Sequence, residues 1–213
     1  MWIAGSVVAT MLCSLLIVGG RPLPAQAAND DPPRKIVTGW MPYWNTKGAM
    51  ATIMANSDLF PEVMPFWFSV KSQTKVLDQY DPANAAPMAD QVKALQAAGI
   101  KVVPSLTDGT GKLAMQKILG DATKRAQLVK TLADLAVKNG FDGLDLDWEG
   151  FAFTDGTASW AVTSPLWTTF VKELAIKLHA QGHILSVTTP EVRDPASGKK
   201  GYWVYNWPEI GPV

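Results

Sequence analysis

The sequence contains little cysteine and no excess of charge of either sign. Its one thiol, Cys13, lies in an apolar N-terminal stretch. A chain that has lost this stretch could form no disulfide bond, so disulfides would add nothing to its stability. The 19 Lys and Arg residues balance 19 Asp and Glu residues. Because nothing here provides the basic surface that nucleic-acid binding requires, we expect no nucleic-acid partner.

The N-terminus is typical of an export signal. Residues 3–20 are apolar apart from small hydroxyl residues, and Ala25-Gln26-Ala27 forms a small-x-small cleavage site. We therefore predict a signal peptide over residues 1–27, a polar linker over 28–34, and a secreted or cell-envelope protein with no stable membrane insertion after cleavage. An uncleaved anchor is the alternative, since an apolar run of about 18 residues approaches the length that spans a bilayer.

From residue 35 onward, predicted strands and helices alternate. The strands begin at residues 36, 63, 100, 141 and 184, and the segments between them carry apolar residues at helical spacing, clearest between Asp121 and Gly140. Helices are also expected over residues 46–57 and 87–98, and a further helix is expected to begin with Ser164 as its cap and Pro165 as its first residue. Repeated strand-then-helix order with apolar strands indicates an α/β fold with a parallel sheet covered by helices. We predict one domain over residues 35–213.

The fourth predicted strand, Phe141–Gly150, carries the chemistry. In it acidic and apolar residues alternate: Asp145, Asp147 and Glu149 with Leu144, Leu146 and Trp148. A strand places the two sets on opposite faces, with Asp147 and Glu149 about 6–7 Å apart along the chain. Carboxylates this close interact, and a neighbouring like charge raises the pKa of a carboxyl group.

Two parallel folds are compatible with this alternation, and the acids discriminate between them. On the covered face of an open sheet, three unpaired carboxylates would each cost several kcal/mol. In a (β/α)8 TIM barrel the acids point into the barrel, with Glu149 at its C-terminal mouth and the leucines against the helices. The barrel is the prediction. A solvated edge strand and a metal site are the alternatives, although His179 and His183 are expected on the surface and we predict no metal.

The segment Asp142-Gly-Leu-Asp145-Leu-Asp147-Trp-Glu149 resembles the Asp-Gly-x-Asp-x-Asp-x-Glu signature of family 18 glycoside hydrolases, the chitinases and related enzymes. The resemblance implies that the motif lies on the fourth barrel strand and that no cofactor is used. It further implies that Glu149 is the general acid, that Asp147 orients the substrate acetamide, and that Asp145 tunes the charge of Asp147. The nucleophile would be the substrate's own acetamido oxygen.

Aromatic residues are candidates for sugar stacking, because the sequence has nine Trp residues whose flat faces suit sugar rings. The predicted substrate-binding residues are Trp40, Tyr43, Trp44, Trp67 and Trp148, together with Asp142, which is expected to hold the loop that enters the strand. Packing in the core is the alternative for each Trp. The implied partner is a polysaccharide containing N-acetylglucosamine, whether chitin, peptidoglycan or an N-glycan core, and a complete barrel is expected to be monomeric.

The sequence also departs from the family pattern. Where the family commonly has Ser-x-Gly-Gly, the segment Ser105–Gly109 keeps the serine and replaces the glycine pair. Five strands are predicted, and the sixth-strand Met-x-Tyr-Asp element and the eighth-strand Trp have no counterpart. We therefore expect about five of eight βα units, in a C-terminally incomplete barrel that does not hydrolyse substrate unaided. A non-catalytic, lectin-like relative is the alternative, which the intact Glu149 disfavours.

Overall fold

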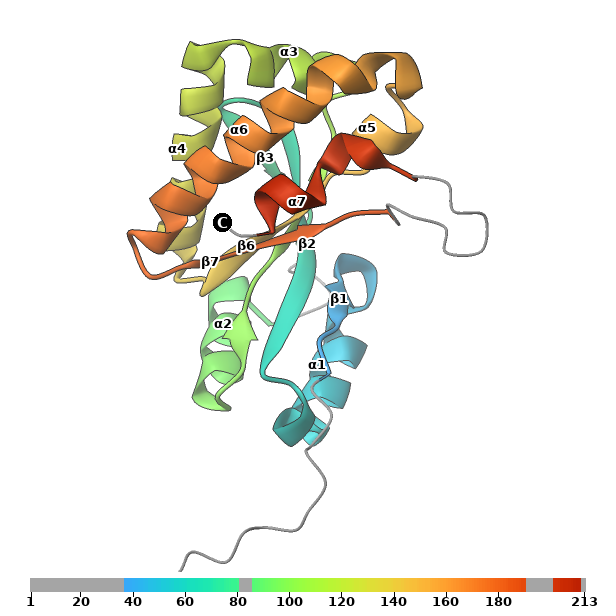
Figure 1. Cartoon of the computed structure of the whole chain (residues 1–213). Coiled ribbons are helices and arrows are strands. Elements are labelled where there is room, and N and C mark those ends of the chain that lie inside the picture. The colour runs from blue at the N-terminus through green and yellow to red at the C-terminus, as the bar shows by residue number, and fades with distance from the viewer. Residues whose placement is uncertain (1–36, 81–85, 191–200, 212–213) are drawn as a thin grey trace, which may run out of the picture. The chain divides into compact units, whose positions relative to one another are not determined.

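The computed structural model describes residues 37–80, 86–190 and 201–211. All of them belong to one compact unit, Lys35–Val213, shown in Figure 1. The predicted signal peptide and linker, residues 1–34, lie outside the described residues. Within the described ranges, no helix has both the length and the apolar character needed to cross a membrane.

Five parallel strands form the central path of the sheet, as the sequence predicts. Its order is β1 (Trp40–Pro42), β2 (Glu62–Ser72), β5 (Ser105–Asp108), β6 (Gly143–Asp147) and β7 (Ile184–Thr188). The short β4 (Lys101–Val102) runs parallel to the start of β2. β3 (Lys75–Asp78), which the sequence analysis missed, pairs antiparallel with β2. Chain order and spatial order therefore agree along the parallel strands, as in a barrel wall.

Helices fill the connections between the strands (Figure 1). They are α1 (Thr46–Ala55), α2 (Met88–Ala97), α3 (Ala114–Gly120), α4 (Ala122–Asn139), α5 (Gly150–Phe153), α6 (Trp160–His179) and α7 (Trp207–Ile210). The 3-10 turn η4 (Trp203–Tyr205) precedes α7. Helices α1, α2 and α4 follow the predicted segments closely, whereas α3 and α5 were not predicted.

The ends of α4 are set by local chemistry that the sequence displays. The carboxylate of Asp121 accepts hydrogen bonds from the backbone N–H groups of Thr123 and Lys124, at 2.9 and 3.1 Å, which satisfies two donors left free at a helix N-terminus. Gly140 ends the helix with φ of 66°, a left-handed conformation that glycine adopts without steric cost. Both helix ends confirm the prediction.

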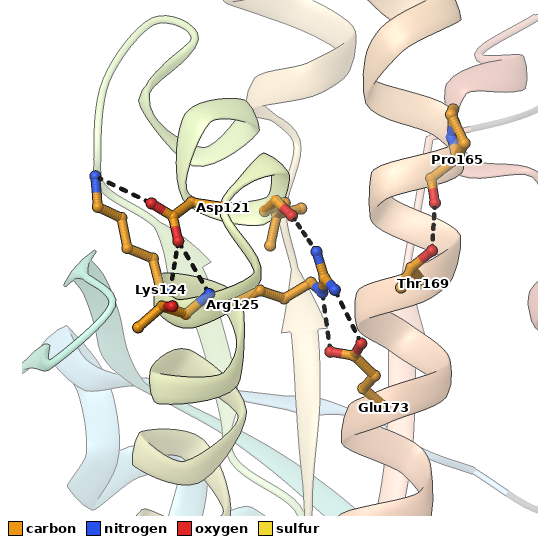
Figure 2. Close-up of polar contacts among 8 residues, drawn as sticks. Asp121, Lys124, Arg125, Pro165, Thr169 and Glu173 are labelled. Atoms are coloured by element: carbon orange, nitrogen blue, oxygen red, sulfur yellow. Dashed lines mark hydrogen bonds and ion pairs between the residues drawn. The ribbon is translucent and has the colours of Figure 1, made fainter.

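An ion pair joins α4 to α6. The guanidinium of Arg125 donates from Nε and Nη2 to the two carboxylate oxygens of Glu173, at 2.9 and 3.1 Å, and from Nη1 to the Leu119 carbonyl at 2.8 Å. Figure 2 shows this fork between the two helices. Paired Arg–carboxylate contacts fix orientation as well as adding energy, so this pair holds the two helices in register.

The start of α6 corrects one sequence expectation. Ser164 and Pro165 were expected to begin this helix, but it begins at Trp160 and Pro165 lies inside it. The first turn buries Trp160, whose indole N–H donates to the Phe151 carbonyl at 2.7 Å. Thr169 Oγ1 donates to the Pro165 carbonyl at 2.9 Å (Figure 2). Burial of the indole outweighs the one backbone hydrogen bond that a proline removes.

The apolar core lies on one face of β6. Leu144 and Leu146 are fully buried and share one cluster with Leu132 of α4 and Leu174 of α6. Side chains of a strand alternate between faces, so the acids of β6 lie on the opposite face, as predicted. The sheet therefore separates a helix-covered core from the face that carries the acids.

Candidate active site

Asp145 is the innermost acid and is fully buried. Strand register places Ser105 of β5 on one side of it and β7 on the other. Its carboxylate accepts from Ser105 Oγ at 2.6 Å and from Thr188 Oγ1 at 3.2 and 3.3 Å. A buried charge needs such donors, since burying it without them is costly. Neither hydrogen bond to Asp145 can be predicted from the sequence, because the sequence alone does not give the register between strands.

Asp147, one pleat further along β6, is half-buried. Burial raises the pKa of its carboxyl group to about 6, and the charges of Glu149 and Asp145 add to the rise. Repulsion between neighbouring carboxylates therefore contributes to the raised pKa of Asp147, second to burial. A group that titrates near neutral pH can hold or release a proton during a reaction.

Glu149 follows the end of β6 and is exposed. Its backbone carbonyl accepts from the N–H groups of Ala152 and Phe153, at 3.0 and 3.1 Å, in the short helix α5. The chain therefore turns away at this point and leaves the Glu149 carboxylate at the carboxyl end of the strands. This is the end at which barrel enzymes carry their active sites.

A cavity of about 470 Å³ opens beside the two outer acids. Its lining consists of Trp40, Pro42, Trp44, Phe66, Asp147, Glu149 and Thr188. Trp40 and Trp44 are 56% and 70% exposed, so both predicted rings lie with the acids and offer faces to a ligand. Tyr43 does not line the cavity, and its ring instead packs edge-on against Trp44 at 4.9 Å.

Two lining residues were missed by the sequence analysis, and strand register explains both. Phe66 lies opposite Pro42 where β1 pairs with β2. Thr188 lies opposite Asp147 where β6 pairs with β7. The run Phe66-Trp67-Phe68 is an aromatic signal in the sequence, but only the structure shows that Phe66 lines the cavity that contains the acids.

The structure contradicts the prediction that Trp67 and Trp148 stack on sugar. Both are fully buried. Trp148 stacks on Phe170 of α6 with ring centroids 5.0 Å apart, and Trp67 packs edge-on against Tyr80 at 5.2 Å. Trp148 shares its strand face with Leu144 and Leu146, which explains its place in the core. The prediction that these two rings bind substrate is therefore wrong, and the alternative, packing in the core, is confirmed.

Asp142 also lies away from the cavity. Its carboxylate accepts from the backbone N–H of Val102 at 2.8 Å and from the Gln96 side-chain amide at 2.9 Å. These contacts hold the segment that leads into β6, at the end of the strand opposite Glu149. Asp142 was grouped with the substrate-binding residues; the structure assigns it only the loop-holding role.

Asp108 occupies a place where the resembled pattern has glycine. It ends β5, and its carboxylate accepts from the N–H and the hydroxyl of Thr110, at 2.9 and 2.7 Å. Burial raises its pKa, against the lowering effect of these hydrogen bonds. A Cβ at Gly150 would lie 3.2 Å from Asp108 Oδ2, so the glycine after Glu149 leaves room for this carboxylate beside the site.

The arrangement combines one carboxyl group that titrates near neutral pH, one exposed carboxylate and two exposed indole rings around one cavity. Among the described residues, no group of three or more His, Cys, Asp or Glu side chains could hold a metal ion. The side chains present can transfer protons and hold flat, partly apolar rings such as sugars.

A comparison with known families decides the assignment. A family model described as Glycosyl hydrolases family 18 matches residues 37–212. The chain belongs to this family. The parallel α/β sheet and its helices are accordingly part of a family 18 barrel, and the glycoside hydrolase signature on β6 lies where the sequence placed it.

Individual relatives agree with the family assignment. Chitinase Chi52 of Paenibacillus xylanexedens is 30% identical over 135 residues, which are 61% of this chain and 24% of that protein. Among solved structures, a chitinase from Chromobacterium violaceum aligns with a TM-score of 0.65 and 18% identity, over 82% of this chain and 52% of that one. A class V chitinase from Pseudomonas fluorescens gives 0.64 and 20%, over 84% and 51%. The chain thus spans about half the length of these solved structures.

The raised pKa of Asp147 predicts how stability depends on pH. The folded-state value of about 6 exceeds the ordinary 3.8, so the stability that this group contributes is present below about pH 4 and is lost as pH rises through about 6. Asp147→Asn removes that loss. The variant is expected to be more stable than wild type above about pH 6, by roughly 1 kcal/mol after allowance for partial exposure.

Urea unfolding of both proteins between about pH 4 and pH 8 checks this expectation. The difference in the free energy of unfolding should shrink toward zero as the pH falls to about 4. A difference that stays constant across the range would show that ionisation of Asp147 does not destabilise the folded protein.

Proposed function

We propose that this family 18 chain is a glycosidase that hydrolyses β-1,4 linkages of polysaccharides containing N-acetylglucosamine, with chitin or peptidoglycan as the substrate. The observation that carries the proposal is one cavity lined by Glu149, by Asp147 with its raised pKa, and by two exposed indoles. The proposal includes secretion through residues 1–27, no cofactor, and a monomeric barrel.

In the proposed reaction, Glu149 donates its proton to the glycosidic oxygen as the bond from that oxygen to the anomeric carbon breaks. The substrate's acetamido oxygen attacks the anomeric carbon from the other side and forms an oxazolinium-type intermediate. Glu149, now a carboxylate, takes a proton from the water that opens this intermediate. Two displacements at one carbon leave its configuration unchanged.

Asp147 and Asp145 support this attack in the proposal. Asp147 accepts the acetamide N–H and so places the carbonyl oxygen against the anomeric carbon. Asp145, held by Ser105 and Thr188, lies below Asp147, and its charge helps to raise the pKa of Asp147. Trp40 and Trp44 stack on sugar rings, which keeps the substrate against the acids.

Product analysis on the 213-residue chain tests the proposal. Chitin oligomers and peptidoglycan are incubated with the protein, and the anomeric proton of the first product is followed by NMR. If the chain hydrolyses the substrate, the shorter oligomers should be released as the β-anomer. Release of the α-anomer would contradict the substrate-assisted route.

Carbohydrate binding without catalysis is the second candidate. It is favoured by the two exposed indoles of the cavity, Trp40 and Trp44, because such rings hold a sugar whether or not the acids act on it. Binding of chitin oligomers without any product would support this candidate and would agree with the sequence prediction that the chain does not hydrolyse substrate unaided. Absence of both binding and product would contradict both candidates.

A further inference from the structure

Tyr205 is a buried tyrosine that reaches the catalytic strand from a distant part of the chain. It belongs to η4, which follows β7, and its side chain is fully buried. Its hydroxyl donates a hydrogen bond to the backbone carbonyl of Trp148 at 2.6 Å, across 57 residues of sequence. The ring packs edge-on against Trp167 at 6.0 Å and lies 6.1 Å from Phe151.

The carbonyl that Tyr205 holds belongs to the peptide bond leading into Glu149. Pairing of β6 with β7 ends at Asp147, so the strand ladder no longer fixes the backbone beyond that residue. The Trp148 carbonyl is held by Tyr205, and the Glu149 carbonyl is held by the N–H groups of Ala152 and Phe153. The two peptides that flank the Cα of Glu149 are thus both fixed.

This backbone support matters because the Glu149 carboxylate lies exposed at the end of the strand, and no hydrogen bond joins it to another described side chain. A side chain in this situation takes its direction from its backbone, since the backbone dihedrals limit the allowed rotamers. Loss of the hydroxyl would free the Trp148 peptide to rotate and would let the carboxylate move relative to Asp147 and the cavity.

The surroundings of Tyr205 keep its hydroxyl a donor. Burial raises its pKa, and the carboxylates of Glu149, Asp147 and Asp108 raise it further, while the backbone of Ala152 lowers it. The phenol therefore stays protonated at every pH at which the protein would work, and the hydrogen bond to Trp148 persists as the neighbouring acids titrate.

From these contacts we infer that Tyr205 is a positioning residue: its hydroxyl fixes the peptide before Glu149 and so aims the Glu149 carboxylate toward Asp147 and the cavity. The catalytic meaning of this inference rests on the proposed function, in which Glu149 is the general acid. The structural part of the inference concerns only the distance between the charges of Glu149 and Asp147, and it does not depend on the proposed function.

Titration of Asp147 tests the structural part of the inference separately from its catalytic part. The charges near this carboxyl group are those of Asp145 and Glu149 on its own strand, and Asp108 and Tyr205 lie on the neighbouring segments. NMR follows the Asp147 carboxyl in wild type, in Tyr205→Phe and in Glu149→Gln, the last of which reports the midpoint without the Glu149 charge. We expect the Tyr205→Phe midpoint to fall from the wild-type value most of the way to the Glu149→Gln value.

Tyr202→Phe is the matched control. Tyr202 lies three residues before Tyr205, and its ring packs against Phe153 and Trp160 at 5.3 and 5.9 Å. Its hydroxyl makes no hydrogen bond to the Trp148 carbonyl, which accepts from Tyr205. This variant is expected to keep the wild-type midpoint. A folded Tyr205→Phe protein whose Asp147 titrates as in wild type would overturn the inference, whether or not the wild type shows turnover.

A second variant covers the case in which Tyr205→Phe does not fold. Phe151→Leu loosens the same aromatic packing and keeps the hydroxyl, so it should lower the melting temperature without moving the Asp147 midpoint. A lowered midpoint in Phe151→Leu would assign the effect to packing and overturn the role of the hydroxyl. Where turnover is measurable, Tyr205→Phe should reduce kcat about tenfold and leave KM within about twofold, because the group acts on the acid and not on sugar binding.

Discussion

Glu149→Gln is expected to reduce hydrolysis of N-acetylglucosamine oligomers by at least about 100-fold and to leave their binding within about twofold. A positioned general acid contributes about 10²–10⁴-fold to a rate, and an amide cannot donate the proton that the leaving oxygen needs. Because Glu149 is exposed at the cavity, the isosteric change should not disturb the fold. Initial rates on chitin oligomers and calorimetric binding measure the two effects.

Glu62→Gln is the matched control for this experiment. Glu62 begins β2, at the amino ends of the parallel strands and so away from the cavity, and the change should alter neither rate nor binding. Equal turnover by wild type and Glu149→Gln would contradict the assignment of the general acid. Equal binding with no turnover by either protein would favour the non-catalytic, carbohydrate-binding function.

Trp148→Ala is expected to destabilise the protein by about 3–5 kcal/mol, the usual cost of removing a large buried aromatic side chain. Its indole is fully buried between Phe170, Trp167 and Phe151, so the change leaves a cavity in the core behind β6. Domains are commonly stable by only 5–15 kcal/mol. The urea concentration at which half of the variant is unfolded should therefore lie well below the wild-type value, as circular dichroism would measure.

Trp44→Ala provides the comparison, since it removes the same side chain from the exposed wall of the cavity. This variant is expected to keep the wild-type unfolding midpoint and to bind chitin oligomers about tenfold or more weakly. Trp is among the side chains whose truncation most weakens binding, and a loss of about 1.4 kcal/mol is tenfold in affinity. If Trp148→Ala stays folded and loses only binding, the core assignment of Trp148 is wrong.

The sequence predicts local features well wherever one physical rule acts alone. Alternation in Phe141–Gly150 placed the acids and the leucines on opposite faces, and the structure confirms both faces. Asp121 and Gly140 marked the ends of α4 because capping depends on adjacent residues. Pro165 misled for the opposite reason: a helix start is favoured locally at a proline, but the burial of Trp160 extended α6 past it.

The same alternation already contained the evidence against Trp148 as a sugar-binding residue. Trp148 occupies the face of Leu144 and Leu146, so a strand that turns its acids toward substrate must turn this ring toward the helices. Strand geometry therefore decides the position of Trp148, and the general affinity of Trp for sugar does not. For Trp40, Trp44 and Trp67, by contrast, no local pattern separates the exposed rings from the buried one.

By itself, the sequence determined the order of strands and helices, the acid-bearing face of β6 and the signature that identifies family 18. These follow from periodicity, capping and residue spacing, which act over a few neighbouring positions. Only the tertiary structure decided which side chains come together across strands: Ser105 and Thr188 on Asp145, Trp40 and Phe66 in one cavity with Asp147, and Tyr205 on the peptide before Glu149. Such contacts depend on strand register and on packing between residues 40 or more positions apart in the sequence, and no short-range rule encodes them.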